Sequence, residues 1–138
     1  MAGKEARLQA ECVIWYRNEW YQNLKNLWAT FNEGLNSNGK ISMGMVPGVP
    51  DLFLYEPKKR GLVGIEMKYI GEKHEVLHVV RQANFILDVC DAGGFCDSKN
   101  QFMQIIQGQF EWYDPRKVLV YLATLKTKSF VWDSSKFI

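Results

Sequence analysis

Apolar side chains recur every three or four positions in two stretches of the chain, which is the period of a helix with one buried face. The first stretch covers about the first thirty residues and includes Leu8, Cys12 and Trp15. The second runs over residues 73–92 and stops at the glycine pair 93–94. The pattern predicts one long helix, or two with a bend, at the start of the chain, and a later helix that ends at the glycines.

Two shorter segments are predicted to be strands, and side chains two apart in a strand share a face. They are residues 51–54 and 63–69, and the stretch between them at 56–61 contains a proline, a glycine and three basic residues. The odd-numbered residues of the second segment are apolar and share one face, whereas Glu66 and Lys68 share the other. We therefore expect a hairpin whose second strand has a core face and a charged face.

The register of this hairpin decides whether a third charged residue joins Glu66 and Lys68. A hairpin that is symmetric about its turn sets Phe53 opposite Glu66, and Asp51 opposite Lys68. Asp51 is then a diagonal neighbour of Glu66, about 7–8 Å away between backbones, which is close enough for the two carboxylates to share a cation. A slip of one residue would move Asp51 to the opposite face.

The remaining segments predict a loop and several short elements. Residues 32–46 are rich in Gly, Asn and Ser, which indicates a loop with a short strand at 40–43. We expect a short helix at 99–109, a strand at 117–125 and a partner strand at 129–132. This order of helix, antiparallel strands, helix and strand predicts an α/β fold in which helices cover one sheet.

Composition narrows the class of protein without deciding its function. The chain has 138 residues, of which 47% are hydrophobic, and this supplies enough apolar surface for one domain. The sequence starts without a charged leader and hydrophobic run and has no apolar stretch of membrane-spanning length, so we expect a soluble, cytoplasmic protein. A net charge of +2 is too small to indicate a nucleic-acid partner. The odd number of cysteines, at Cys12, Cys90 and Cys96, predicts reduced thiols.

Asp51, Glu66 and Lys68 are the first candidate site. Two carboxylates and an ammonium in a sheet lose solvation unless they are paired or bind a metal. One interpretation is an ordinary cross-strand ion pair. The other is a site for Mg²⁺ or Mn²⁺, since carboxylate oxygens and the backbone carbonyl of Met67 are ligands that hard cations prefer. The spacing alone leaves both interpretations open.

A second pattern competes with the first. The run His74-Glu75-Val76-Leu77-His78 matches the His-Glu-X-X-His motif of zinc metalloproteases, and on a helix both histidines would share one face. No further histidine exists in the chain, so a third ligand would have to be an acidic residue, namely Asp88, Asp91 or Glu111. The alternative is that the two histidines are ordinary helix residues.

Three features together carry a resemblance to a known family. They are Gly48-Val49-Pro50-Asp51 before a strand, Gly64-Ile65-Glu66-Met67-Lys68 on the next, and a helix that bears Gln82 and ends at Gly93. This combination resembles the VRR-NUC family of the PD-(D/E)XK nuclease superfamily over about residues 11–95. The resemblance implies a restriction-endonuclease-like αβββαβ core with a mixed central sheet flanked by helices. Residues 1–138 would form one domain, with an added segment at about 97–115 and closing strands at about 117–132.

The resemblance also assigns roles. Asp51 and Glu66 would bind a divalent metal, Lys68 would serve catalysis, Glu11 on the first helix would complete the acidic site, and Gln82 would lie beside it. The stretch from Lys68 to Gln82 is longer than the family pattern.

The expected activity is a Mg²⁺- or Mn²⁺-dependent DNA endonuclease that selects branched, junction or flap DNA. Stand-alone members of the family resemble dimeric Holliday junction resolvases, so a homodimer is a further expectation. The alternatives are the zinc metalloprotease and a nucleic-acid-binding module without catalysis.

Overall fold

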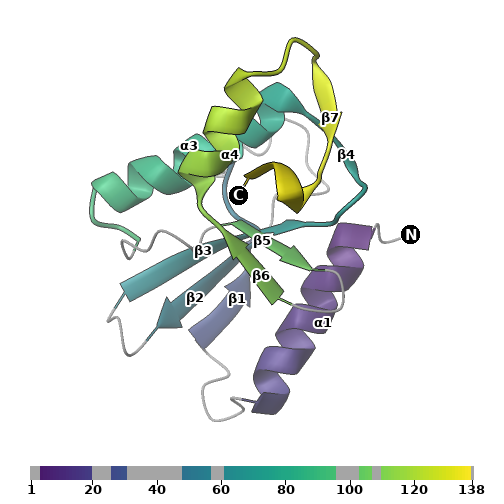
Figure 1. The fold of residues 1–138 in the computed structure, drawn as a ribbon. Helices are drawn as coiled ribbons and strands as arrows, with labels where there is room; N and C mark the ends of the chain where they lie inside the picture. The colour runs from purple at the N-terminus through teal and green to yellow at the C-terminus, as the bar shows by residue number, and fades with distance from the viewer. Residues whose placement is uncertain are drawn as a thin grey trace, which may run out of the picture.

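The computed structural model describes residues 4–19, 26–30, 48–56, 61–95, 103–106 and 110–137, and Figure 1 shows their arrangement. The helices are α1 (Lys4–Glu19), α3 (Val76–Asp91), α4 (Pro115–Ala123) and the short 3₁₀ helix η2 (Ser134–Phe137). The strands are β1 (Leu27–Ala29), β2 (Leu52–Glu56), β3 (Gly61–Lys68), β4 (Lys73–Glu75), β5 (Met103–Ile106), β6 (Phe110–Tyr113) and β7 (Ser129–Val131). The chain therefore has the mixed α/β composition that its sequence predicts.

Five of these strands form one mixed sheet in the order β1-β2-β3-β5-β6. The β1, β2 and β3 strands are antiparallel neighbours, whereas β5 runs parallel to β3 and β6 returns antiparallel to β5. The parallel pair requires a crossover, and α3 lies within it. The remaining strands, β4 and β7, pair with each other in a separate two-stranded sheet.

Helices cover both faces of the large sheet (Figure 1). On one face, Leu8 and Cys12 of α1 pack against a buried cluster from the strands that comprises Leu27, Leu52, Val63, Ile65 and Met67. The predicted core face of the second hairpin strand is thus confirmed. Burial raises the pKa of the Cys12 thiol to about 11, which keeps it in the protonated form.

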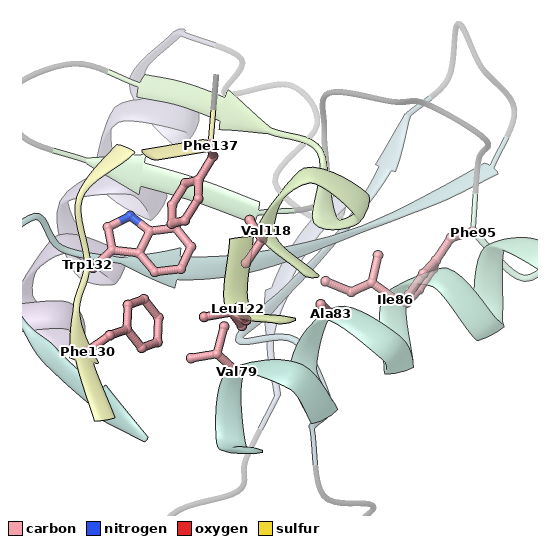
Figure 2. Close-up of a cluster of buried hydrophobic side chains, with 9 residues drawn as sticks. All are labelled: Val79, Ala83, Ile86, Phe95, Val118, Leu122, Phe130, Trp132 and Phe137. Atoms are coloured by element: carbon pink, nitrogen blue, oxygen red, sulfur yellow. The ribbon is translucent and has the colours of Figure 1, made fainter. Parts of the chain in front are cut away.

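The other face is covered by α3, α4 and the C-terminal segment (Figure 2). Val79, Ala83 and Ile86 of α3 meet Val118 and Leu122 of α4 in this second cluster. Figure 2 shows the rings of Phe130, Trp132 and Phe137 closing one end of it and Phe95 the other. The Trp132 and Phe137 rings lie 4.6 Å apart between centroids. This cluster fixes α3 over the charged face of β3.

Two predicted elements are wrong in type, and a third has a different partner. Residues 103–106, expected in a helix, form β5, and residues 117–123, expected in a strand, belong to α4. The α4 helix begins because Asp114 accepts a hydrogen bond from the backbone N–H of Arg116 at 2.9 Å and Pro115 occupies the first turn. The Ser129–Val131 strand exists, but it pairs with β4.

Two predicted helix boundaries also change. Residues 27–29 form the edge strand β1 and do not continue the first helix. The later helix starts at Val76, because residues 73–75 form β4, and it ends as expected before Gly93, whose φ is +81°. The strand expected at 40–43 and the third cysteine, Cys96, lie outside the described residues.

The hairpin register differs from the symmetric one by two residues. Phe53 pairs with Gly64, and Leu52 pairs with Ile65. Continued by one position, this register sets Asp51 opposite Glu66. Because side chains alternate with a period of two, a shift of two residues keeps Asp51 on the charged face, where a shift of one would have removed it.

Among the described residues, no helix is long and apolar enough to cross a membrane.

Candidate functional site

Asp51 directly precedes β2, and its carboxylate takes the place of a backbone acceptor for β3. The pairing of β2 with β3 ends at Leu52 and Ile65. Beyond this pair, the backbone N–H of Met67 donates a hydrogen bond to Asp51 Oδ2 at 2.8 Å. This hydrogen bond holds the Asp51 side chain against β3.

The segment before Asp51 passes very close to α3. Gly48 has a φ of +90°, and a Cβ at this position would lie 2.9 Å from the backbone oxygen of Arg81. Glycine therefore permits both the backbone conformation and the close approach. The approach brings the Asp51 segment against the helix turn that carries Gln82. The sequence interpretation used Gly48 only as part of a family motif and missed this role.

Glu66 and Lys68 are two residues apart on β3 and point to the face that α3 covers. Their side chains are 2% and 1% exposed, and Lys68 Nζ lies 3.1 Å from Glu66 Oε1. Such burial is rare for charged residues, because removing each charge from water costs roughly several kcal/mol of solvation free energy. The charged face of β3 is therefore enclosed.

Gln82 joins this pair from α3. Its side chain is 6% exposed, and its amide nitrogen Nε2 donates to Glu66 Oε1 at 2.6 Å. Gln82 lies on the inward face of α3, one turn from Val79 and adjacent to Ala83, both fully buried. The packing of α3 thus delivers a polar side chain to the carboxylate.

The electrostatics of Glu66 are unbalanced. Burial raises the pKa of Glu66 well above its ordinary value, the positive charge of Lys68 opposes this shift, and the adjacent Asp51 carboxylate adds to it. Oε1 receives both Lys68 and Gln82, whereas Oε2 is buried and has no hydrogen-bond donor among the described residues. Two carboxylates and one ammonium thus adjoin here. A proton or a cation would balance the remaining negative charge of the site.

Glu11 is placed differently from the other predicted residues. It lies on α1, next to Cys12, with its side chain exposed, while α1 packs against the apolar face of the sheet. Within the described residues, no group of three or more His, Cys, Asp or Glu side chains is arranged to hold a metal. The structure thus brings together Asp51, Glu66 and Gln82 with Lys68, and the ligand role of Glu11 stays a prediction.

The two histidines do not share a helical face. His74 lies in β4, where its ring packs against Phe130 and Trp132 at 6.3 Å between centroids in each case. His78 lies on α3, and its Nε2 is 3.2 Å from the Nε2 of Gln82. The helix needed for the His-Glu-X-X-His motif starts only at Val76, so the geometric premise of the zinc protease is wrong. The contact between His78 and Gln82 was missed, although their spacing of four residues on a helix could have indicated it.

Comparisons with family models, with curated proteins and with solved structures found no match to this chain.

Proposed function

We propose that this protein is a divalent-metal-dependent DNA endonuclease that hydrolyses phosphodiester bonds. The order α1, three antiparallel strands, α3, and a strand parallel to β3 supports the restriction-endonuclease-like core that the sequence resemblance implies. In that resemblance the acidic residue of one strand and the Glu-X-Lys of the next lie on one face of the sheet. Asp51, Glu66 and Lys68 have this relation here.

The observation that carries the proposal is the buried oxygen Oε2 of Glu66. Among the described residues it has no hydrogen-bond donor, and the Asp51 carboxylate beside it raises the pKa of Glu66 further. An ion pair that served stability alone would satisfy its buried oxygens, because an unsatisfied buried acceptor costs about 1–3 kcal/mol. Two adjacent carboxylates with an unsatisfied oxygen suit a hard cation.

The residues fit Mg²⁺ or Mn²⁺. Asp51 and Glu66 would hold the ion, with the Met67 carbonyl as a further ligand. The resemblance adds Glu11, whose exposed side chain lies on α1 over the other face of the sheet and would have to reach around the sheet edge. A bound ion of this kind supplies charge stabilisation at a phosphoryl oxygen and lowers the pKa of bound water.

The protein side chains would perform the remaining tasks. Lys68, fixed by Glu66, presents an ammonium that stabilises the negative charge developing on the phosphoryl group or orients the attacking water. Gln82 and Lys68 together hold Glu66 Oε1, which leaves Oε2 as the oxygen that would bind the ion. Asp51 is oriented by the N–H of Met67. The buried setting strengthens each of these interactions, since water does not screen them.

The choice of DNA, and of branched, flap or junction DNA within it, comes from the resemblance, as does the homodimer. The competing proposal is a nucleic-acid-binding module without catalysis. It predicts that the protein binds DNA and leaves it intact in Mg²⁺ or Mn²⁺.

A cleavage assay separates these possibilities. Linear, flapped and four-way DNA are incubated with the protein in Mg²⁺, Mn²⁺ or chelator, beside variants in which Asp51, Glu66 or Lys68 is changed singly to Ala. We expect cleavage that needs the metal and is abolished in all three variants. The matched control is Glu75→Gln, at an exposed glutamate of β4, which should cleave normally and would lose activity only in a protease of the His-Glu-X-X-His type. A fully active Glu66→Ala protein would refute the proposal.

A further inference from the structure

The amide nitrogen of Gln82 makes two contacts that place the same demand on both neighbours. It lies 2.6 Å from Glu66 Oε1 and 3.2 Å from His78 Nε2. An amide nitrogen carries two hydrogens and only donates, so each partner must accept. The ring nitrogen can accept only if the imidazole is neutral and carries its proton on Nδ1.

The orientation of this amide follows from its surroundings. Reversing the amide would direct Gln82 Oε1 at Glu66 Oε1, which is an acceptor toward the Lys68 ammonium at 3.1 Å. A proton on Glu66 would sit on Oε2, because Oε1 already faces the ammonium. Oε1 therefore accepts in both protonation states of Glu66. The nitrogen of the Gln82 amide, and not its oxygen, must face Glu66.

We propose that His78 is a positioning residue for the active site, acting through Gln82. Its Nε2 accepts the second amide hydrogen, which locks the amide with its nitrogen toward Glu66 and its carbonyl oxygen turned away. That oxygen, Gln82 Oε1, is buried and has no donor among the described residues. In the locked amide, Gln82 Oε1 can accept a hydrogen bond from a water molecule in the site. The claim that this locking serves catalysis rests on the proposed nuclease function.

The placement of His78 makes it suited to this role. Its side chain is exposed on α3, while Gln82, one turn later, is 6% exposed. The ring thus caps the buried chain Gln82–Glu66–Lys68 on its solvent side. Without this acceptor, the second amide hydrogen would turn to water, and only the hydrogen bond to Glu66 Oε1 would hold the amide plane.

Three substitutions at position 78 test the acceptor directly, because the side chain is exposed. His78→Gln keeps an acceptor, His78→Leu has none, and His78→Lys supplies only donors. We expect kcat for DNA cleavage to fall about 10-fold in His78→Leu and at least as much in His78→Lys, with KM changed less than about twofold. His78→Gln should recover most of kcat. Leu77→Ala, at the adjacent position that is 68% exposed, is the control and should keep normal kcat and KM.

Two kinetic outcomes would overturn the proposal. Normal kcat in His78→Leu would show that the amide needs no acceptor at this position. A rise in KM that His78→Gln fails to reverse would assign His78 to direct substrate contact.

A second measurement does not depend on cleavage. Nitrogen-15 NMR of the whole metal-free protein at neutral pH reports which ring nitrogen of His78 carries the proton and whether the Gln82 amide protons are hydrogen-bonded. We expect the Nδ1–H ring, and loss of one protected amide proton in His78→Leu. An Nε2–H ring would overturn the proposal even in an active enzyme. A protein that cleaves no DNA but has the Nδ1–H ring would refute the nuclease function while supporting the amide arrangement.

Discussion

The two faces of β3 differ in how completely their buried side chains are packed or hydrogen-bonded. On the α1 side, Val63, Ile65 and Met67 are buried among apolar neighbours and require nothing further. On the α3 side, Glu66, Lys68 and Gln82 are equally buried, yet one oxygen of Glu66 and one of Gln82 have no donor among the described residues. One face of β3 therefore stabilises the fold, whereas the other face and the α3 residue above it carry unsatisfied polar groups, as the proposed site requires.

The largest expected effect comes from removing the charge on the polar face. Lys68→Met keeps the length of the side chain and should lower kcat for DNA cleavage about 100- to 1000-fold, because a preorganised positive charge is lost. The fold should survive, since an apolar residue of similar volume can replace a buried ion and Glu66 can take up a proton. Cleavage kinetics and a thermal melt check both points. Normal kcat in Lys68→Met would contradict the proposal that the charged face of β3 carries the active site.

Truncation of the apolar face should have the opposite outcome. Ile65, which is 3% exposed, fills the cluster beneath α1. Ile65→Ala should lower the free energy of unfolding by about 2–5 kcal/mol through lost burial and a residual cavity. The protein that remains folded should cleave DNA with normal kcat, as measured below its melting temperature. A selective loss of kcat would mean that the apolar face also shapes the site.

The contact that joins the polar face to α3 can be tested at Gly48. Gly48→Ala adds a Cβ 2.9 Å from the Arg81 backbone oxygen at a φ of +90°. We expect a cost of about 1–3 kcal/mol in unfolding free energy, and a fall in kcat as Asp51 and Gln82 move apart. Gly71→Ala is the matched control, because Gly71 has a φ of +91° with nothing within 4 Å. Equal effects in both variants would attribute the cost to backbone strain alone.

The smallest expected effect is a pH dependence of stability. Because burial raises the pKa of Glu66, the folded protein keeps a proton that the unfolded chain releases. The stability of the metal-free protein should therefore fall as the pH rises from the ordinary carboxyl pKa toward the raised one. Glu66→Gln should remove this fall and raise the melting temperature by a few degrees at neutral pH.

Melting curves from about pH 5 to 8 measure this effect. The matched control is Glu75→Gln, at an exposed glutamate, which should follow the wild type. A wild-type curve as flat as that of Glu66→Gln would show that Glu66 is not held protonated. Added Mg²⁺ or Mn²⁺ should stabilise the wild type more at high pH, since the metal competes with this proton.

Local signals account for the predictions that succeeded and for one that failed. The alternation along β3 identified both of its faces, because a period of two depends only on the strand itself. The end of α3 followed from Gly93. The helix α4 was mistaken for a strand because Val118 and Val120 are β-branched, although Asp114 and Pro115 are a helix-start signal that should have outweighed them.

Other features had no local signal. The β5 strand exists because it pairs in parallel with β3, a contact between distant parts of the chain. The hairpin register was off by two residues, and only the face of Asp51 was right. The contact between His78 and Gln82 depends on α3 docking over β3.

The sequence by itself determined which side chains carry charge and which strand face each occupies, because these follow from residue type and local periodicity. Only the tertiary structure decided that Glu66 and Lys68 are buried, that Gln82 reaches Glu66 Oε1, and that Glu66 Oε2 lacks a donor within the described residues. The physical reason is that burial and hydrogen bonding depend on what packs above a residue. At this site the covering element is α3, which lies in the crossover between β3 and β5.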